Sequence, residues 1–148
     1  MRTTLVDTGP LVAFLNRRDH HHRWAVDTLA ALRPPLLTCE AVLSEAIYLV
    51  RSLPAGGEAV MEMLARGVIR PVFRLEDEAS AVKTLVARYR DVPMDLADAC
   101  LVRMTEIYAE PALVTLDTEF RDIYRRHGRK TIPTVLPEAR KRGSRGRR

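Results

Sequence analysis

Short apolar segments that suit β-strands alternate along the whole chain with longer segments that have the hydrophobic periodicity of helices. Strands separated by helices form βαβ units, whose strands run parallel in one sheet with helices on both faces. The sequence therefore predicts an α/β fold built around a central, mostly parallel sheet. The strands are expected at residues 3–6, 34–39, 68–75, 112–116 and 131–136.

The predicted helices fill the connections between these strands. The clearest amphipathic pattern is that of residues 76–90, and apolar residues that recur at helical spacing indicate the face turned to the core. The residues expected on that face are Val82, Leu85, Val86 and Tyr89. The full set of helices is expected from Pro10 onward and over residues 17–33, 40–53, 57–67, 76–90, 94–110 and 117–128.

Several residues set the ends of these elements. Asp19 is a suitable N-cap for the second helix, and Gly67 and Gly128 are expected to end the helices before them. Pro71 cannot donate a backbone hydrogen bond, so the third strand is expected at an edge of the sheet or with a bulge.

The length of 148 residues suits one domain with a substantial core, and 47% of the residues are hydrophobic. No apolar run reaches the ~18 residues that a membrane-spanning helix needs, and the N-terminus does not resemble a signal peptide. Cys39 and Cys100 both lie in apolar sequence, so we expect them to be buried and reduced. These features predict a cytoplasmic protein.

The basic character of the chain is concentrated near its C-terminal end. The formal net charge is +5, but residues 139–148 carry six positive charges and no negative ones, which leaves −1 for the rest. A segment rich in Arg, Gly and Ser cannot bury enough apolar surface to fold alone. We therefore expect one domain over residues 1–137 and a flexible basic tail over residues 138–148. This tail is either solvated surface or a non-specific phosphate contact that weakens with salt.

Acidic residues directly follow two of the predicted strands. Asp7 follows the first strand and Asp117 follows residues 112–116, and in a parallel sheet both emerge at the edge where such sheets bind ligands. Asp95 and Asp98 stand three apart in the first turn of the preceding helix, so they face the same way. Each acid taken alone is also explained as a helix cap. Together, like charges at one edge repel each other unless cations neutralise them.

Glu45 lies inside a predicted helix and not at its start. The side chains three and four positions from it are Ala41, Val42, Tyr48 and Leu49. A carboxylate on this face is poorly solvated and needs a partner such as a metal ion. Glu40 competes with Glu45 for the same role, but its place in the first turn is better explained by the helix dipole.

The residue types at this edge favour a hard divalent cation. Mg²⁺ takes oxygen ligands, and a pair of such ions can hold the attacking and leaving oxygens of a phosphodiester. The sequence has no Cys/His spacing that suits zinc. His20, His21 and His22 are consecutive, so on a helix they point in different directions and cannot chelate one ion together.

Four segments of the chain form an ordered series: "LVDTGPLVAFL", "TCEAVLSEAIYLV", "DLADACLV" and "ALVTLDTEF". In this order they resemble the motif blocks of the PIN-domain ribonucleases, most closely the VapC-type toxins of bacterial toxin–antitoxin pairs. The resemblance covers residues 3–136. It implies a three-layer α/β/α fold and metal-dependent RNA cleavage with Mg²⁺ or Mn²⁺, leaving a 5′-phosphate and a 3′-hydroxyl.

The resemblance also implies site roles by position. The catalytic acids that it implies are Asp7, Glu45, Asp98 and Asp117. Three of these, Asp7, Asp98 and Asp117, would bind the metal, with Asp95 as a nearby acid that some members also use. Asp98 is favoured over Asp95 as the main ligand. Thr115 matches a hydroxyl residue that often supports the site.

The partners implied by the resemblance are an RNA substrate, a small antitoxin protein that inhibits the domain, and a second copy of the chain in a homodimer. Basic residues must then hold the RNA backbone. The candidates are Arg17, Arg18 and the run at 125–130, although solvated surface charge is the favoured explanation of each single Arg, because charged residues are mostly exposed.

Three other functions stay open at this point. The domain could bind RNA or a protein partner through the same pocket without catalysing a reaction. A phosphoacceptor receiver domain also has acids at strand ends, but it carries paired acids after the first strand and a Lys near the last. Here Asp7 stands alone and no suitable Lys is present. A phosphatase of the haloacid-dehalogenase type needs Asp-x-Asp where this chain has Asp-Thr-Gly, so it too fits less well.

Overall fold

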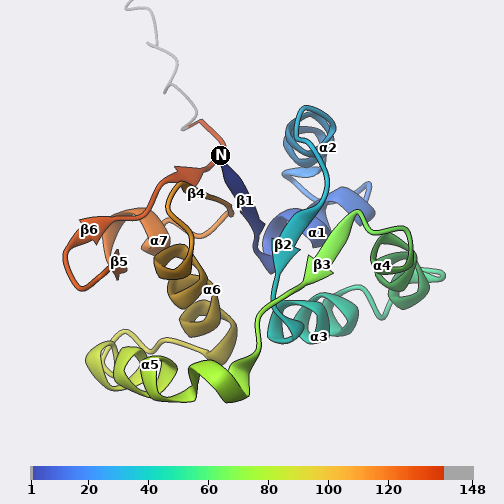
Figure 1. Ribbon diagram of the computed structural model, residues 1–148. Coiled ribbons are helices and arrows are strands. Elements are labelled where there is room, and N and C mark those ends of the chain that lie inside the picture. The colour runs from blue at the N-terminus through green and yellow to red at the C-terminus, as the bar shows by residue number, and fades with distance from the viewer. Residues whose placement is uncertain (1, 139–148) are drawn as a thin grey trace, which may run out of the picture.

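Five parallel strands form the central sheet of the structure, a computed structural model that describes residues 2–138. Figure 1 shows how these residues are arranged. The strand order is β3-β2-β1-β4-β7, and every neighbouring pair is parallel. β1 and β4 pair along their whole length, from Thr3 opposite Pro111 to Val6 opposite Val114. The strands are β1 (Thr3–Val6), β2 (Leu36–Thr38), β3 (Ile69–Pro71), β4 (Pro111–Val114) and β7 (Thr134–Val135).

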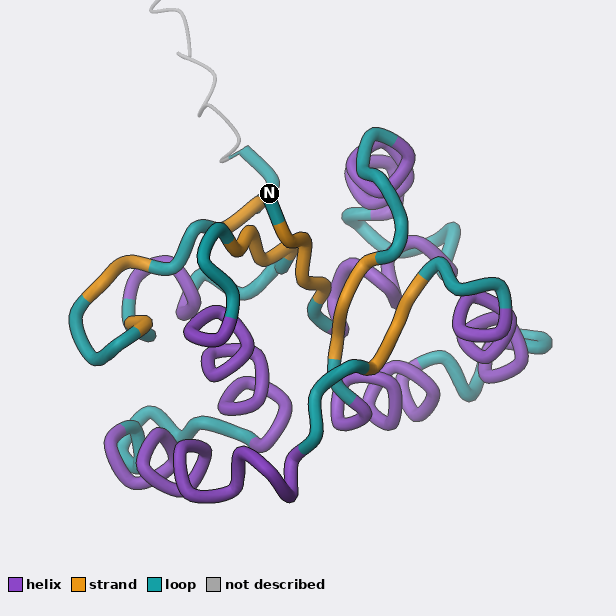
Figure 2. Tube along the Cα trace, viewed as in Figure 1, coloured by secondary structure: helices purple, strands orange, loops and turns teal. Residues whose placement is uncertain are grey.

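Helices lie on both sides of this sheet (Figure 2). α1 contacts α2, α3 and α4, whereas α5 packs on α6, and α6 contacts β1 and β4. The chain passes from β1 through β2 to β3 and then returns beyond β1 to β4, so right-handed crossovers place the two groups of helices on opposite faces. The predicted α/β/α layering is confirmed. The helices are α1 (Thr8–Leu15), α2 (His22–Ala30), α3 (Glu40–Leu49), α4 (Gly56–Ala65), α5 (Leu75–Arg88), α6 (Leu96–Ile107) and α7 (Glu119–Asp122).

The best-buried elements are the two central strands and α6. Leu5 and Val6 of β1 and Leu113 and Val114 of β4 are completely buried. α6 is buried over most of its surface, as a helix with apolar residues nearly all round must be. Its buried residues are Ala97, Ala99, Cys100, Leu101, Val102, Met104 and Thr105. Because packing fixes β1, β4 and α6 against one another, side chains at their ends have well-defined positions.

The helix predicted over residues 117–128 is wrong for its second half. α7 ends after four residues, and the chain then forms an antiparallel hairpin from β5 (Arg125–Arg126) and β6 (Lys130–Thr131). His127 and Gly128 in the turn have φ angles of 53° and 75°. Such left-handed residues occur singly in turns and do not continue a right-handed helix.

Contacts with distant segments hold this hairpin in place. The Arg126 guanidinium donates to the carbonyl oxygens of Thr105 and Tyr108 at the end of α6, at 2.5 and 2.8 Å. The backbone N–H of Arg125 donates to the Tyr89 hydroxyl at 2.9 Å. The local hydrophobic pattern cannot report these bonds, because their partners lie 18 to 36 positions away in the sequence.

Smaller differences concern helix boundaries and one core position. Asp19 does not cap α2; its side chain accepts from the backbone N–H of His21 at 2.8 Å and caps the turn before that helix. α3 ends at Leu49, four residues earlier than predicted. Val86 is 41% exposed, so it leaves the core face of α5, whereas the other three residues predicted on that face are buried.

Other expectations about local structure are confirmed. β3, which contains Pro71, lies at an edge of the sheet. Gly67 follows the end of α4 with a left-handed φ of 74°. Cys39 and Cys100 are both buried free thiols.

Over residues 2–138, none of the helices has the length and hydropathy that crossing a membrane requires. The basic tail predicted over residues 138–148 lies, but for its first residue, outside the part of the chain that the structure describes.

Candidate metal centre

The carboxyl ends of β1 and β4 meet at the switch point of the sheet. β1 leads to β2 on one side and β4 leads to β7 on the other, and ligands bind at such a point in open parallel sheets. A hollow of about 320 Å³ opens here. It brings together all five acids that the sequence singled out. The lining residues are Asp7, Thr8, Gly9, Glu45, Leu49, Asp95, Asp98, Leu116 and Asp117.

Asp7 is held on both of its carboxylate oxygens. One accepts from the backbone N–H of Thr8 at 2.7 Å, which caps α1, and the other accepts from the Thr115 hydroxyl at 2.8 Å. Burial raises the pKa of Asp7 from 3.8 to about 6; the bonds from Thr115 and Thr8 oppose this rise, and Glu45 and Asp117 add to it. Asp7 is therefore both a helix cap and a member of the acidic cluster.

Thr115 connects the acids that follow the two central strands. Its buried hydroxyl donates to Asp7 and accepts from the backbone N–H of Asp117 at 3.0 Å. The Asp117 carboxylate in turn accepts from the backbone N–H of Glu119 at 2.9 Å. One hydroxyl thus fixes the relative positions of Asp7 and the loop that carries Asp117.

Glu45 reaches the hollow from the middle of α3. Its carboxylate accepts from the Thr8 hydroxyl at 3.0 Å, so the first turn of α1 lies between Glu45 and Asp7. Glu45 is half-buried, whereas Glu40 is exposed and lines a different hollow. The structure therefore places Glu45, and not its competitor Glu40, beside the other acids.

Asp95 and Asp98 have different environments at the start of α6. Asp95 is exposed and caps the helix, with its carboxylate accepting from the backbone N–H of Asp98 at 2.7 Å. Asp98 is half-buried. Burial raises the pKa of Asp98 to about 7, and the charges of Asp95, Asp7 and Asp117 add to the rise. The repulsion expected of clustered carboxylates is thus seen at Asp98.

Glu119 joins the cluster, although sequence reasoning did not single it out. Oxygens of Asp98, Asp117 and Glu119 all lie within 4.8 Å of one another, while Asp7 and Asp95 stand outside this closest trio. Glu119 is two residues after Asp117, and in the sequence it looks like an ordinary acid in the first turn of a helix. Only the abrupt turn into the short α7 brings it back to Asp98.

A buried phenol completes the hydrogen-bond network. The Tyr124 hydroxyl lies 3.3 Å from a carboxylate oxygen of Asp98 and 3.2 Å from one of Glu119. Burial, together with the two nearby carboxylates, raises the pKa of Tyr124 well above its usual value. The phenol therefore keeps its proton and acts as a donor to the acids.

The donor set of this cluster fits a hard divalent cation. Carboxylate oxygens are the ligands that Mg²⁺ and Mn²⁺ prefer. A cation relieves the repulsion that adds to the effect of burial on the pKa of Asp98. Asp98, Asp117 and Glu119 are placed to hold one ion, with Asp7 and Glu45 on the adjoining wall of the hollow.

The basic residues predicted to hold RNA are not at this hollow. α1 begins at the acids and runs eight residues away from them, so Arg17 and Arg18 lie beyond its far end, about 12 Å away along the helix. In the hairpin, the guanidinium groups of Arg125 and Arg126 donate to backbone carbonyls. The His22 ring is hydrogen-bonded to the carbonyl of Ala13 at 2.7 Å.

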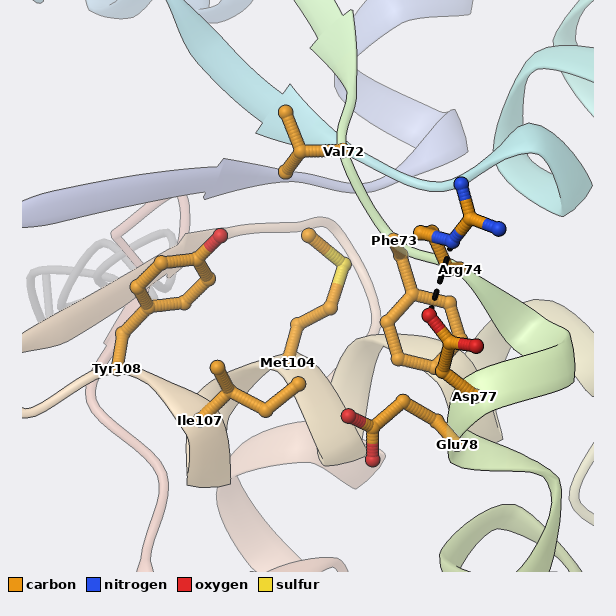
Figure 3. A pocket seen from close by; sticks show the side chains of 8 residues that line it. All are labelled: Val72, Phe73, Arg74, Asp77, Glu78, Met104, Ile107 and Tyr108. Atoms are coloured by element: carbon orange, nitrogen blue, oxygen red, sulfur yellow. Dashed lines mark hydrogen bonds and ion pairs between the residues drawn. The ribbon is translucent and has the colours of Figure 1, made fainter.

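A second hollow, of about 200 Å³, lies between the end of β3, α5 and the last turns of α6 (Figure 3). Its acids are already paired with arginines: Asp77 with Arg74 at 2.9 Å, and Glu78 with Arg103 at 2.7 Å. Tyr108 at its rim is ten residues further along the chain than Asp98, about 15 Å along the helix. This hollow is therefore separate from the candidate metal centre.

Comparisons with known proteins bear on the fold and the family. The sequence model of a family described as "PIN domain" matches residues 4–126. Among solved structures, the chain is similar to the crystal structure of Mycobacterium tuberculosis VapC20, described as a sarcin-ricin loop cleaving toxin. The TM-score is 0.65 at 22% sequence identity, covering 79% of this chain and 92% of that one. At this identity the similarity establishes the fold alone. The chain has no match among curated proteins.

Proposed function

We propose that this chain, which belongs to the PIN domain family, is a ribonuclease that uses Mg²⁺ or Mn²⁺ to hydrolyse phosphodiester bonds in RNA. The observation that carries the proposal is the approach of Asp98, Asp117 and Glu119 to within 4.8 Å of one another. Asp7 and Glu45 line the same hollow. Clustered carboxylates at one strand edge repel one another, and a cation bound among them offsets this repulsion.

In the proposed mechanism, Asp98, Asp117 and Glu119 would hold the cation, and Asp7 and Glu45 line the same hollow. When bound, the cation supplies Lewis acidity, which makes water nucleophilic near neutral pH and offsets charge on the phosphate. Thr115 keeps Asp7 oriented, and Thr8 does the same for Glu45. No side chain has to act as the nucleophile.

We further propose that the chain is the toxin of a toxin–antitoxin pair. VapC20, whose fold this chain shares, is described as a toxin that cleaves the sarcin-ricin loop. For this chain the proposal includes a single-stranded or looped RNA substrate and an antitoxin protein that covers the acidic hollow, all in the cytoplasm.

A homodimer is also part of the proposal. Tyr48, Leu49 and Leu96 are 60%, 46% and 47% exposed on α3 and α6 beside the acids. Clustered apolar side chains on a surface are typical of protein contacts. Sedimentation of the parent chain tests this: a dimer that Leu96→Glu converts to a monomer is the expected result, and a parent that is monomeric at all concentrations contradicts it.

A non-catalytic binding module is the second candidate function, because the same hollow could hold RNA or a partner without cleavage. The phosphoacceptor receiver reading is excluded by topology. Receiver domains have the flavodoxin-like strand order 2-1-3-4-5, whereas this sheet has the order β3-β2-β1-β4-β7.

Measuring RNA cleavage with and without a metal chelator distinguishes the ribonuclease from the binding module. We expect the purified chain to cut labelled RNA with Mn²⁺, to stop when EDTA is added and to recover with excess Mn²⁺. Asp7→Asn should bind RNA but cut it poorly. In a bacterial host, the parent should arrest growth and Asp7→Asn should not. Undiminished cleavage by Asp7→Asn contradicts the proposal, and RNA binding without cleavage by the parent supports the binding module.

A further inference from the structure

Tyr124 has a single, fixed orientation beneath the acidic cluster. Its side chain is completely buried. The ring meets Tyr89 and Phe120 edge to face, with centroid distances of 5.1 and 5.2 Å. Such aromatic contacts stabilise one arrangement of the rings, and the next residue, Arg125, is tied by its backbone N–H to the Tyr89 hydroxyl. The phenol therefore cannot swing away from the acids without disturbing this cluster.

The hydroxyl of Tyr124 joins carboxylates from two separate elements. Asp98 comes from α6 and Glu119 from α7, and the phenol oxygen lies 3.3 and 3.2 Å from them. These are two of the three residues whose oxygens come within 4.8 Å of one another. A phenol has only one proton to donate. The Tyr124 hydroxyl therefore donates to these two carboxylates alternately and interacts with both side chains.

We propose that Tyr124 is a positioning residue, whose hydroxyl holds the Asp98 and Glu119 carboxylates at the separation that a divalent cation requires. The inference rests on the metal centre of the proposed function and adds a residue that does not itself bind the cation. Groups that hydrogen-bond to metal ligands restrict their rotamers, and their loss typically lowers metal affinity about 10–100-fold. The aromatic cluster anchors the phenol, so it transmits the rigidity of the core to the ligands.

The test is Mn²⁺ binding to the full chain, measured by isothermal titration calorimetry in the absence of RNA. Tyr124→Phe keeps the ring and its edge contacts and removes only the hydroxyl. We expect it to weaken Mn²⁺ binding by about tenfold or more. The Mn²⁺ concentration for half-maximal RNA cleavage should rise by a similar factor, with KM for RNA unchanged.

Tyr89→Phe is the matched control. Tyr89 belongs to the same aromatic cluster, but its hydroxyl accepts from a backbone N–H, whereas the Tyr124 hydroxyl donates to the two acids. We expect this variant to lose some thermal stability and to bind Mn²⁺ as the parent does. If Tyr89→Phe weakens Mn²⁺ binding as much as Tyr124→Phe, the effect is one of general packing and the positioning role is wrong.

The outcomes also separate this inference from the proposed function. A parent chain that binds Mn²⁺ but does not cut RNA contradicts the ribonuclease, while the loss of affinity in Tyr124→Phe still supports the positioning role. A parent that cuts RNA, with unchanged Mn²⁺ affinity in Tyr124→Phe, contradicts only the positioning role. A parent that binds no Mn²⁺ at millimolar concentration contradicts both.

Discussion

Thr115 connects the two sides of the candidate site through a single oxygen atom. Its hydroxyl donates to Asp7 and accepts from the backbone N–H of Asp117. Because Asp7 is buried and its pKa is already raised to about 6, this bond is among the few interactions that favour its ionised form. A residue without any charge thus favours the ionised form of an acid, against the larger effect of burial.

Thr115→Val should lower both stability and activity. The substitution keeps the shape of the side chain but leaves a buried carboxylate oxygen and a backbone N–H without this partner, at a cost of about 1–3 kcal/mol. The pKa of Asp7 should rise further, so RNA cleavage should need a higher pH. Urea unfolding and the pH profile of cleavage measure the two effects.

Thr105→Val is the control for Thr115→Val. Thr105 is equally buried, but its hydroxyl bonds to the Val102 carbonyl within α6. Thr105→Val should leave the pH profile of RNA cleavage unchanged. If both variants shift this profile equally, the role given to Thr115 is contradicted.

At the scale of elements, the turn between α3 and α4 shows how closely backbone segments pack behind the site. A Cβ atom on Gly56 would lie 2.2 Å from the carbonyl oxygen of Val50, and the residue before it, Ala55, has a φ of 53°. At Gly57 the nearest atom to such a Cβ is a methyl of Ile47, at an ordinary 3.4 Å. Gly56 therefore has no room for a side chain, whereas the adjacent Gly57 does.

Gly56→Ala should destabilise the protein by about 1–3 kcal/mol, the usual range for overpacking. Gly57→Ala should be neutral or slightly stabilising, since alanine is the better helix former. Chemical denaturation of the two variants beside the parent decides the matter. Equal stability of both variants would show that this turn yields more easily than the structure indicates.

The sequence pattern predicted most of these elements. It failed where contacts between residues far apart in the sequence determine the local structure. Strand ends and buried helices can be recognised from the local pattern of apolar and polar residues. The parallel sheet and the positions of Asp7 and Asp117 were therefore predictable from the sequence. The hairpin after α7 depends on Arg126 reaching the end of α6. Tyr124 stands directly before this hairpin, and no local spacing encodes its bonds to Asp98 and Glu119.

At the scale of the whole molecule, folding gathers acids that repel one another. The folded-state pKa of Asp7 is about 6 and that of Asp98 about 7, against 3.8 for the unperturbed group. The folded protein therefore keeps these protons to a higher pH than the unfolded chain. Stability contributed by these groups is present at low pH and is lost as pH rises from about 4 to about 7.

The parent without metal should lose stability relative to Asp98→Asn as pH rises through this window. Asp98→Asn lacks the titrating carboxyl group. Its free energy of unfolding should therefore increase relative to that of the parent as pH rises. Urea unfolding in EDTA at pH 4.5, 6 and 8 measures it, and Mn²⁺ at pH 8 should restore the parent. A difference that stays constant with pH contradicts the raised pKa of Asp98.

The most direct test of the metal-dependent ribonuclease is the rate of RNA cleavage as a function of Mn²⁺ concentration, compared between the parent and Asp117→Asn. Asp122→Asn is the control, because Asp122 is an exposed acid paired with Arg121 away from the hollow. We expect saturable dependence on Mn²⁺ for the parent and Asp122→Asn, and a rate at least about 100-fold lower for Asp117→Asn, since outer-shell groups alone are worth up to that factor. Cleavage by the parent that persists in EDTA, or that Asp117→Asn retains, would contradict the claim.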